Sequence, residues 1–294
     1  MSRLISRIFD TCMTGISNFN PTLASKIRYR RYLGKKLNLN NPQTLNEKMM
    51  YLKLNKYWDQ QYVADRADKY AVREIIKKAG CPEILIDLYG AWDNVEDIEW
   101  DILPEKFAIK CNHGSGYNII CGDKQSFDVE TAKAKLRKWM SEDYSINRAE
   151  QGIYSKIHKK IIAEKFIETA DGMPPKDYKF FCSYGEVKFL FVASDRINNQ
   201  TKFDYYYPDW TWIPVKNQHP NVGPIEKPKM LEQMIEYAKI LSKDLPLVRV
   251  DLYNEGEKII FGELTFTHYG CLNGFEPDEY DLTFGKCFPD VTKI

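Results

Sequence analysis

RVDLYNEGEKIIFGELT, residues 249–265, is the stretch that decides the fold of this chain. Two β-prone runs, residues 247–253 and 258–265, flank the sequence Asn-Glu-Gly-Glu, a composition that favours a tight turn. The sequence therefore predicts a β-hairpin. Pairing of its two strands would bring Asp251 and Glu263 to the same end of a sheet.

The acidic residues of this predicted hairpin suit a magnesium ion. Mg²⁺ prefers hard oxygen ligands, typically one or two carboxylates, with phosphate oxygens and water completing the shell. Thr265 follows Glu263 by two residues and Arg249 precedes Asp251 by two, so each pair shares a strand face. We predict Asp251, Glu263 and Thr265 as metal ligands. Arg249 would bind a phosphoryl group or a carboxylate through its guanidinium group. The alternative is a structural Arg–Glu pair, although several polar residues on one face would be costly to bury.

A second segment, KCNHGSGYNII at residues 110–120, follows the strand-like run of residues 107–109. Phosphate binding requires converging N–H donors, and glycine lets the backbone approach closely. The segment offers these groups in a turn: Lys110 as a point charge, His113, Gly114, Ser115 and Gly116. The P-loop pattern is absent. By itself such a turn is more often an ordinary hairpin, and a lone histidine is more often structural. Together, the two segments indicate an enzyme that uses ATP.

The bulk composition is that of a globular protein. The 294 residues are enough for about two domains, and a net charge of +1 argues against a dedicated nucleic-acid binder. No run approaches the roughly 18 apolar residues of a membrane span. Arg7 and Asp10 interrupt any signal-peptide core. Seven scattered cysteines without C-x-x-C spacing indicate reduced thiols and argue against a cysteine zinc site, so we expect a cytoplasmic protein.

The remaining patterns predict an α+β fold, with helices at the front and antiparallel hairpins behind. Thr44 and Glu47 have the spacing of a capping box. Helices are expected at residues 1–20, after Thr44, and at 68–79, 128–140 and 228–241. Strands are expected at residues 84–88, within 107–121, at 160–167, as a hairpin within 177–194, and at 247–253 and 258–265.

Two surface patterns leave alternatives open. The first is basic, with six positive residues, and reads as a solvated helix face or as a face that binds a phospholipid surface or an acidic glycan. The second, residues 203–212, is rich in Tyr and Trp and reads as core packing or as a platform for sugar rings. The basic residues are Lys26, Arg28, Arg30, Arg31, Lys35 and Lys36.

Taken in order, these segments resemble the TupA-like (teichuronopeptide biosynthesis) group of ATP-grasp enzymes, from about Leu33 to Gly285. The resemblance implies an ATP-grasp fold, with two α+β lobes clasping ATP and an added helical N-terminal segment. It divides the chain into a helical extension (1–60), an N-terminal core lobe (61–105), a small lobe with a glycine-rich lid (106–170) and a C-terminal lobe with the magnesium site (171–294).

The resemblance also implies a role for individual residues. ATP would be bound by Lys69, Lys110, the turn His113-Gly114-Ser115-Gly116, the hinge Glu164-Lys165-Phe166-Ile167, Asp177 and Lys179, with Glu168 as an alternative ribose ligand. Arg249, Lys110 and Arg196 would serve catalysis. One departure from the family is Thr265, which stands where asparagine is common, and this weakens the case for two fully coordinated Mg²⁺ ions.

The implied reaction is ATP-dependent ligation of a carboxylate to an amine through an acyl phosphate. The implied acceptor is a uronic acid of a bacterial surface polysaccharide or its lipid-linked precursor, which would bring the N-terminal segment to the inner face of the membrane. One alternative is a glycosyltransferase of capsule or exopolysaccharide synthesis, with Asp97-Ile98-Glu99-Trp100-Asp101 as its acidic motif. A non-catalytic glycan- or membrane-binding protein is a third interpretation.

Overall fold

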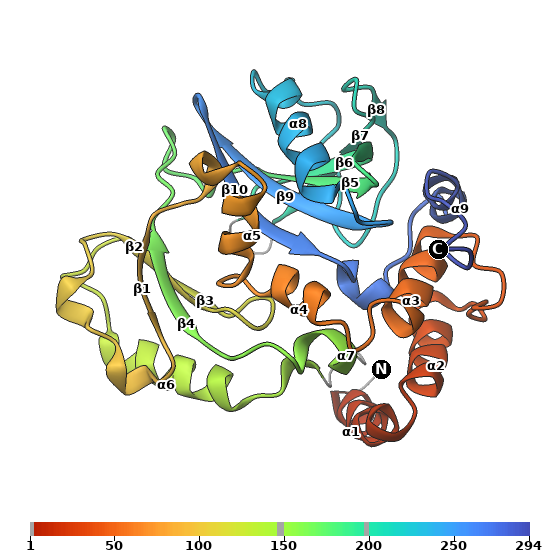
Figure 1. Cartoon of the computed structure of the whole chain (residues 1–294), viewed down its shortest axis with the longest axis horizontal. Coiled ribbons are helices and arrows are strands. Elements are labelled where there is room, and N and C mark those ends of the chain that lie inside the picture. Colours follow the sequence, from red (N-terminus) through yellow and green to blue (C-terminus); the bar gives the residue numbers. More distant parts are fainter. Residues whose placement is uncertain (1–2, 146–149, 197–199) are drawn as a thin grey trace.

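A computed structural model of the chain describes residues 3–145, 150–196 and 200–294. Within these residues, the strands form a four-stranded sheet in the order β1-β4-β2-β3 and a six-stranded sheet in the order β10-β9-β5-β6-β7-β8. We call them the small sheet and the large sheet. Neighbouring strands are antiparallel in both sheets. Helices lie around and between the sheets (Figure 1), so the predicted α+β class is confirmed.

The strands are β1 (Leu88–Trp92), β2 (Phe107–Cys111), β3 (Asn118–Cys121), β4 (Ile161–Lys165), β5 (Asp177–Ser183), β6 (Glu186–Ser194), β7 (Lys202–Tyr206), β8 (Trp212–Ile213), β9 (Val248–Glu255) and β10 (Lys258–Thr265). The α-helices are α1 (Arg3–Phe19), α2 (Pro21–Leu33), α3 (Leu45–Asn55), α4 (Gln61–Ala67), α5 (Val72–Lys78), α6 (Val129–Ser141), α7 (Gln151–Tyr154), α8 (Leu231–Ser242) and α9 (Glu279–Lys286). Short 3-10 helices are η1 (Pro82–Ile84), η2 (Val95–Asp97), η3 (Trp100–Ile102) and η5 (His268–Cys271).

The small sheet has one apolar face, which α6 covers. Phe107 and Ile109 are two residues apart in β2, so they lie on the same face of the sheet. They belong to one hydrophobic cluster with Leu136 of α6. Asp128 caps α6 by accepting a hydrogen bond from the Thr131 N–H at 2.9 Å. Because side chains alternate along a strand, Lys110 lies on the other face of this sheet.

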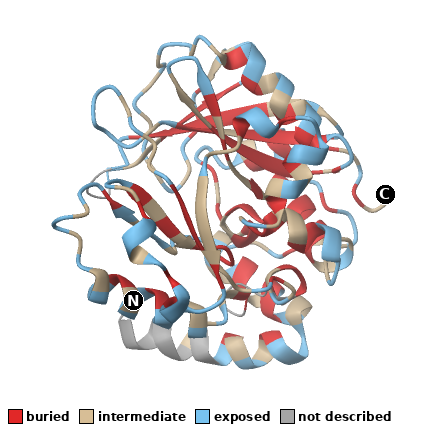
Figure 2. Ribbon diagram, turned by 60° about the vertical axis from the view of Figure 1, so that its left-hand side comes forward, coloured by how far each residue is buried: buried red, intermediate tan, exposed pale blue. Residues whose placement is uncertain are grey.

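The large sheet carries most of the core. Figure 2 shows the buried residues concentrated in its strands, and α8 packs against β5, β6 and β9. Phe180, Val250 and Leu252 are fully buried. Because the strands alternate, Arg249 and Asp251 lie on the opposite face, and Lys179 pairs with Asp251 across β5 and β9. One sheet therefore presents an apolar face to α8 and a charged face on its other side.

The local predictions hold for most elements, with two corrections. The strand expected at residues 84–88 begins only at Leu88, because Pro82 starts the 3-10 helix η1, in which Leu85 N–H donates to the Pro82 carbonyl at 3.1 Å. The helix expected from residue 68 begins at Val72. Asp68 instead accepts hydrogen bonds from the N–H groups of Tyr70 and Ala71, which form a turn before the helix.

The N-terminal helices pack on the end of the chain. The Thr44–Glu47 capping box is present, and α3 contacts α9, where Asp281 accepts hydrogen bonds from the backbone and side chain of Asn46. No helix in the described part of the chain is long and apolar enough to cross a membrane.

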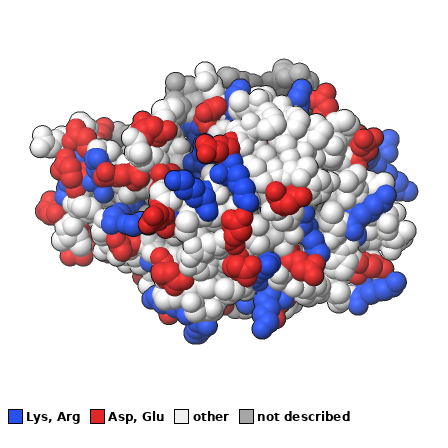
Figure 3. Space-filling model, turned by 90° about the horizontal axis from the view of Figure 1, so that it is seen from above, with Lys and Arg blue, Asp and Glu red and all other residues white. Residues whose placement is uncertain are grey.

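The six basic residues of the N-terminal segment do not form one solvated face. Arg28 is buried and donates to Ser17 Oγ at 2.8 Å, Arg31 lies over the Phe9 ring, and Lys35 pairs with Asp278. Lys26, Arg30 and Lys36 remain exposed. Elsewhere, on the face seen in Figure 3, acidic and basic side chains are intermixed.

Candidate functional site

The hairpin formed by β9 and β10, here called the acidic hairpin, gathers four polar side chains. Glu263 pairs with Asp251 and Thr265 with Arg249, in a register shifted by a bulge at Gly262. The Arg249 guanidinium contacts Asp251 at 2.6 and 2.7 Å, Glu263 Oε1 at 3.1 Å and Thr265 Oγ1 at 2.9 Å. The shared face expected from the sequence is therefore present, with an arginine between the carboxylates.

Strand β5 adds a third carboxylate beside this hairpin. Lys179 forms ion pairs with both Asp177, at 2.6 Å, and Asp251. The Arg196 guanidinium lies 3.6 Å from Asp177. Burial raises the pKa of Asp177, an effect that Lys179 opposes and the charge of Asp251 reinforces. Its Oδ1 atom is buried and has no hydrogen-bond partner among the described residues. A further cation would therefore be stabilised at this point.

Lys69 connects the acidic hairpin to the turn of residues 113–116, here called the glycine turn. Its Nζ atom donates to the Gly114 carbonyl at 2.6 Å and lies 3.6 Å from Glu263 Oε2. Burial alone raises the pKa of Glu263, but the charges of Lys69 and Arg249 outweigh it and lower that pKa to about 2. Glu263 is consequently ionised at neutral pH.

The glycine turn requires glycine at two positions. Gly114 and Gly116 have φ angles of 143° and 80°, which other residues rarely adopt, and a Cβ on Gly114 would lie 2.9 Å from the Tyr144 ring. Lys110, in the strand before the turn, pairs with Glu164 at 2.5 Å. At Gly114 the backbone of the turn therefore lies too close to the Tyr144 ring for a side chain to fit between them.

His113 is turned away from this region. Its ring is buried, Nε2 lies 3.1 Å from the Trp139 carbonyl of α6, and the side chain is absent from the described lining of the cavity presented next. Burial lowers the pKa of His113. The side chain thus holds the turn against α6, as in the structural interpretation of a lone histidine.

A cavity of 640 Å³, here called the main cavity, joins these groups. Most of the predicted site residues line it, together with residues that the sequence did not single out. The predicted residues are Lys69, Lys110, Gly114, Ser115, Gly116, Asp177, Lys179, Arg196, Arg249, Asp251, Glu263 and Thr265.

The predicted hinge lies elsewhere. Lys165, Phe166 and Ile167 line a second cavity, of 810 Å³, between the end of β4 and the edge strand β10. Glu168, the alternative ribose ligand, lines it as well, and Ile260 contributes from β10. Glu164 is buried and contacts Lys110 and Arg73, the latter at 3.5 Å. Through the pair Lys110–Glu164, the main cavity and the hinge share one contact.

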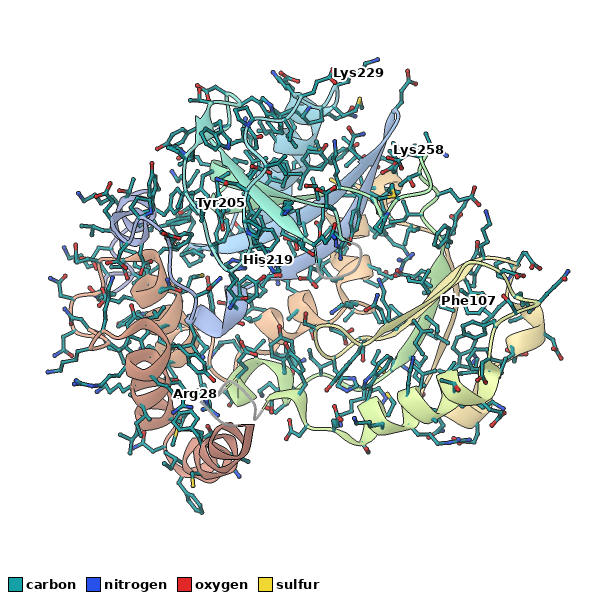
Figure 4. The ribbon with its side chains drawn as sticks, turned by 180° about the vertical axis from the view of Figure 1, so that it is seen from behind. Arg28, Phe107, Tyr205, His219, Lys229 and Lys258 are labelled. Carbon is teal, nitrogen blue, oxygen red and sulfur yellow. The ribbon has the colours of Figure 1, made fainter. Side chains whose placement is uncertain are left out.

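Several residues of the main cavity were not predicted. Tyr144, Glu150 and Tyr154 lie outside any motif, so no sequence signal singled them out. His268 contacts Arg249 through Nδ1, and its position three residues after Thr265 was a signal that could have found it. His219 and Tyr269 also line this cavity, and Figure 4 shows His219 at the lower edge of the large sheet.

The aromatic run supports the packing interpretation at most of its positions. Tyr205 and Tyr206 are fully buried, and Trp210 stacks on Tyr206 with ring centroids 4.1 Å apart. Phe203 alone of this run lines the main cavity in the described structure, where its ring lies 4.5 Å from that of His219.

The oxygen groups of the acidic hairpin fit a magnesium ion. Asp251 and Glu263 provide carboxylates and Thr265 a hydroxyl, which are hard ligands. In the described residues, His, Cys, Asp and Glu do not gather in groups of three or more as a complete metal cage. Mg²⁺ commonly binds through one or two carboxylates while a bound phosphate and water supply the rest, so this set is sufficient.

Comparison with known proteins identifies the family. The model of the TupA-like ATP-grasp family matches residues 47–289. No curated protein matches the sequence. Similar solved structures include D-alanine–D-alanine ligase from Bacillus anthracis complexed with ATP, at 15% identity and a TM-score of 0.43, covering 69% of this chain and 55% of that one.

Two further structures are similarly distant. They are D-alanine–D-alanine ligase from Helicobacter pylori (13% identity, TM-score 0.42, covering 85% of this chain and 69% of that one) and a D-cycloserine synthetase (12%, 0.44, 77% and 70%). The chain spans about half the length of the Bacillus anthracis ligase. Because the family model covers most of the sequence, the chain belongs to the TupA-like ATP-grasp family and has an α+β ATP-grasp fold.

Proposed function

We propose that this protein is an ATP-dependent carboxylate–amine ligase that binds the triphosphate in the main cavity. The observation that carries the proposal is Lys69, which contacts both the Gly114 carbonyl and Glu263. A single cation thus spans the two groups that the sequence assigned to phosphate and to metal. Family membership supports the same activity.

Charge neutralisation is the first requirement of this reaction. ATP and a carboxylate are both anionic, and two unit charges 4 Å apart interact by about 4 kcal/mol at an effective dielectric constant near 20. Lys69, Lys110, Lys179, Arg196 and Arg249 line the main cavity and would offset that repulsion. Lys110 and Arg196 would contact the phosphates or the acceptor, and Arg249 the transferred phosphoryl group.

Asp251, Glu263 and Thr265 would hold Mg²⁺, which when bound supplies positive charge to the phosphate oxygens. The residues of the chain then align the reactants. Arg249 contacts both carboxylates and Thr265, so its guanidinium is fixed where it would contact the transferred phosphoryl group. The glycine turn would close over the site and exclude water from the acyl phosphate.

The adenine would occupy the hinge side. We assign it to Lys165, Phe166 and Ile167, with Ile260 from β10 as an apolar partner. Glu164 would hold the Lys110 side chain in position through their ion pair. The ribose would hydrogen-bond to Asp177 or Glu168. We divide the chain into a helical extension (1–60) and lobes at 61–105, 106–170 and 171–294. The hinge residues then lie near the end of the lobe 106–170, and Asp177 lies near the start of the lobe 171–294.

The acceptor would be a uronic acid on a bacterial surface polysaccharide or its precursor, joined to an amine. Support comes from the family name and from the rings of Phe203, His219 and Tyr269 on the main cavity, which suit stacking on a sugar. A lipid-linked precursor would place the enzyme at the cytoplasmic face of the membrane. Lys26, Arg30 and Lys36, which are exposed, and the exposed Phe19 ring would then contact anionic lipid.

No observation favours the glycosyltransferase alternative. The acidic stretch 97–101 runs from the end of the short helix η2 into η3, and its residues are absent from the described lining of both cavities. Asp97 accepts a hydrogen bond from Asn94 at 2.8 Å.

The test is nucleotide dependence. At 100 times its Kd, Mg·ATP should add about 2.7 kcal/mol to the free energy of unfolding and so raise the thermal midpoint. UDP- and GDP-sugars should leave the thermal midpoint unchanged. Lys110→Ala should remove most of this response, and Lys133→Ala, which replaces an α6 lysine paired with Glu130, should keep it. Stabilisation by a nucleotide sugar but not by Mg·ATP would refute the proposal. A mass increase on a uronic-acid oligosaccharide incubated with ATP and mixed amines would identify the acceptor.

A further inference from the structure

One wall of the main cavity is aromatic and includes part of a long loop. Phe203 of β7 and His219 both line the main cavity, and their ring centroids lie 4.5 Å apart. His219 belongs to residues 214–230, here called the β8–α8 loop, which lie within the described chain and contain neither a helix nor a strand. Loops of more than about 15 residues without secondary structure are uncommon in compact domains and are often functional. The proposed phosphate chemistry does not use this loop.

Phe203 and the next residue, Asp204, lie on opposite faces of the large sheet, because side chains alternate along β7. Phe203 pairs with Ala193, and Ala193 pairs with Asp177, so Phe203 shares the charged face that borders the main cavity. Asp204 pairs with Val192 and lies on the apolar face, where it is 0% exposed. A carboxylate buried at such a place is costly unless hydrogen bonds satisfy it.

The β8–α8 loop supplies those hydrogen bonds through its backbone. The Gly223 N–H donates to Asp204 Oδ1 at 2.9 Å, and the Val222 N–H donates to Oδ1 at 3.1 Å and to Oδ2 at 3.3 Å. Burial raises the pKa of Asp204, and the hydrogen bonds from Gly223 and Val222 oppose this shift. The Val222 side chain is exposed, so its backbone, and not its side chain, attaches the loop to the sheet.

The loop therefore passes around the edge of β7 from one face of the large sheet to the other. The Phe203 N–H donates to the Pro220 carbonyl at 2.9 Å, which fixes the loop immediately after His219. Residues 222–223 then reach Asp204 on the apolar face. Because these attachments are so close in sequence, releasing residues 222–223 would move His219 relative to the Phe203 ring. Asp204 thus controls part of the main cavity from the opposite face.

Aromatic rings continue from this wall to the arginine that would contact the transferred phosphoryl group. The Phe191 ring lies 4.6 Å from the Phe203 ring and 5.5 Å from the His268 ring. His268 in turn contacts Arg249. An acceptor whose carboxylate is phosphorylated beside Arg249 would therefore extend along these rings. Aromatic side chains with a few polar groups are the usual lining of a site for a small organic ligand.

Resting on the proposed ligase function, we propose that Asp204 is a positioning residue for the sugar acceptor. By binding the N–H groups of Val222 and Gly223, it fixes the β8–α8 loop so that His219 and Phe203 form a subsite for the pyranose ring of a uronic acid. The Asp204 side chain contacts neither the acceptor nor ATP, because it lies on the other face of the sheet. Acceptor binding therefore depends on Asp204, whereas nucleotide binding does not.

The experiment is a calorimetric titration of the Mg·ADP-loaded protein with glucuronate and galacturonate oligosaccharides. Asp204→Ala should weaken oligosaccharide binding about 10-fold and leave Mg·ADP binding within about twofold of wild type. Asp204→Asn keeps a carbonyl oxygen for the two N–H groups and should recover most of the affinity. The matched control is Asp209→Ala, in the exposed turn between β7 and β8, where Asp209 accepts from the Thr211 N–H at 2.9 Å. This control should change neither affinity.

A double-mutant cycle tests whether Asp204 acts through the loop. His219→Ala removes the ring itself and should weaken oligosaccharide binding to a similar degree. The double substitution should then bind about as weakly as His219→Ala alone, because both changes remove the same wall. In turnover, the loss should appear in KM for the oligosaccharide, with kcat and KM for ATP unchanged. Additive losses would show that Asp204 acts elsewhere and would overturn the proposal.

Wild-type oligosaccharide affinity in Asp204→Ala would make Asp204 a structural anchor only and overturn the proposal. So would the absence of oligosaccharide binding to the wild type. If Asp204→Ala does not fold, Val222→Pro, which removes the N–H that reaches both Asp204 oxygens, takes its place with the same expected results. Failure of the wild type to bind Mg·ATP would instead refute the ligase function, and the same titrations without nucleotide would still decide the role of Asp204.

Discussion

At the scale of single residues, the site is a balance of closely spaced charges. Asp177, Asp251 and Glu263 share the charged face of the large sheet, where Arg249 and Lys179 hold them together. Carboxylates this close would repel one another without positive partners. Under the proposed assignment, the arrangement that stabilises the fold would also supply the oxygen ligands of a metal ion.

Replacing one of these carboxylates tests their assignment. Glu263→Gln keeps the shape of the side chain but removes its negative charge. The pKa of the Glu263 carboxyl is about 2, so this group is ionised at neutral pH. We expect turnover to fall at least about 100-fold, with a much smaller change in nucleotide binding, because the metal acts mainly on the transferred group. Steady-state kinetics and nucleotide titration measure the two effects. Glu236→Gln, at an exposed position of α8, is the matched control. Full activity in Glu263→Gln would disprove the metal assignment.

The buried His113 predicts a pH dependence of stability. Burial lowers its pKa in the folded protein below the ordinary value of 6.5, so the unfolded chain binds more protons just below pH 6.5. The contribution of His113 to stability is therefore complete above pH 6.5 and is lost as the pH falls toward the folded pKa. His113→Gln does not titrate and retains an N–H for the Trp139 carbonyl. Between pH 7.5 and 5.5, urea unfolding should show wild type losing up to about 1 kcal/mol more than the variant. Parallel pH curves would contradict this prediction.

At the scale of elements, local patterns predicted what local contacts determine. The hairpins β2–β3 and β9–β10 and the cap of α3 depend on residues close in sequence, and all three are present. The bulge at Gly262 could not be read from the alternation, yet it sets Glu263 opposite Asp251. The contact from Lys69 to Gly114 spans 45 residues and follows from tertiary packing, so the sequence did not predict it. The family resemblance assigned both groups to ATP, but separately.

The failures at this scale have physical causes. The strand expected at residues 84–88 was displaced by the turn at Pro82. For the aromatic run the sequence left two interpretations open, and burial of Tyr205 and Tyr206 in β7, between β6 and β8, supports the core-packing one. Glu150 belongs to no periodic or glycine-rich pattern, so its burial beside the main cavity became visible only in the folded chain.

The capping box of α3 provides the prediction for this scale. Thr44 accepts a hydrogen bond from Glu47 N–H at 3.2 Å, and Glu47 Oε2 accepts from Thr44 N–H at 3.2 Å. Thr44→Ala should lower the free energy of unfolding by about 1 kcal/mol, measured by urea denaturation. Thr283→Ala, within α9, should have a smaller effect, because Thr283 Oγ1 only bonds the carbonyl one turn back. Equal effects of the two substitutions would show that the cap contributes no specific stability.

At the scale of the whole molecule, the main cavity takes its walls from elements that are distant in sequence. The glycine turn connects β2 and β3 of the small sheet, the acidic hairpin belongs to the large sheet, and Lys69 lies between α4 and α5. Each sheet is stabilised by its own hydrophobic cluster. A ligand in the main cavity would therefore connect two separately packed cores, while α3 packs on α9.

This arrangement predicts where nucleotide binding reduces motion. A non-hydrolysable ATP analogue with Mg²⁺ should slow amide hydrogen exchange in residues 113–118 and 262–266 together, because one ligand contacts the glycine turn and the acidic hairpin at once. Residues 129–141 of α6 should change little, since that helix faces away from the main cavity. Lys69→Met, which removes the cation joining both walls, should weaken binding and reduce the protection of both segments at a fixed ligand concentration. Protection confined to one segment would show that the ligand does not connect the two sheets.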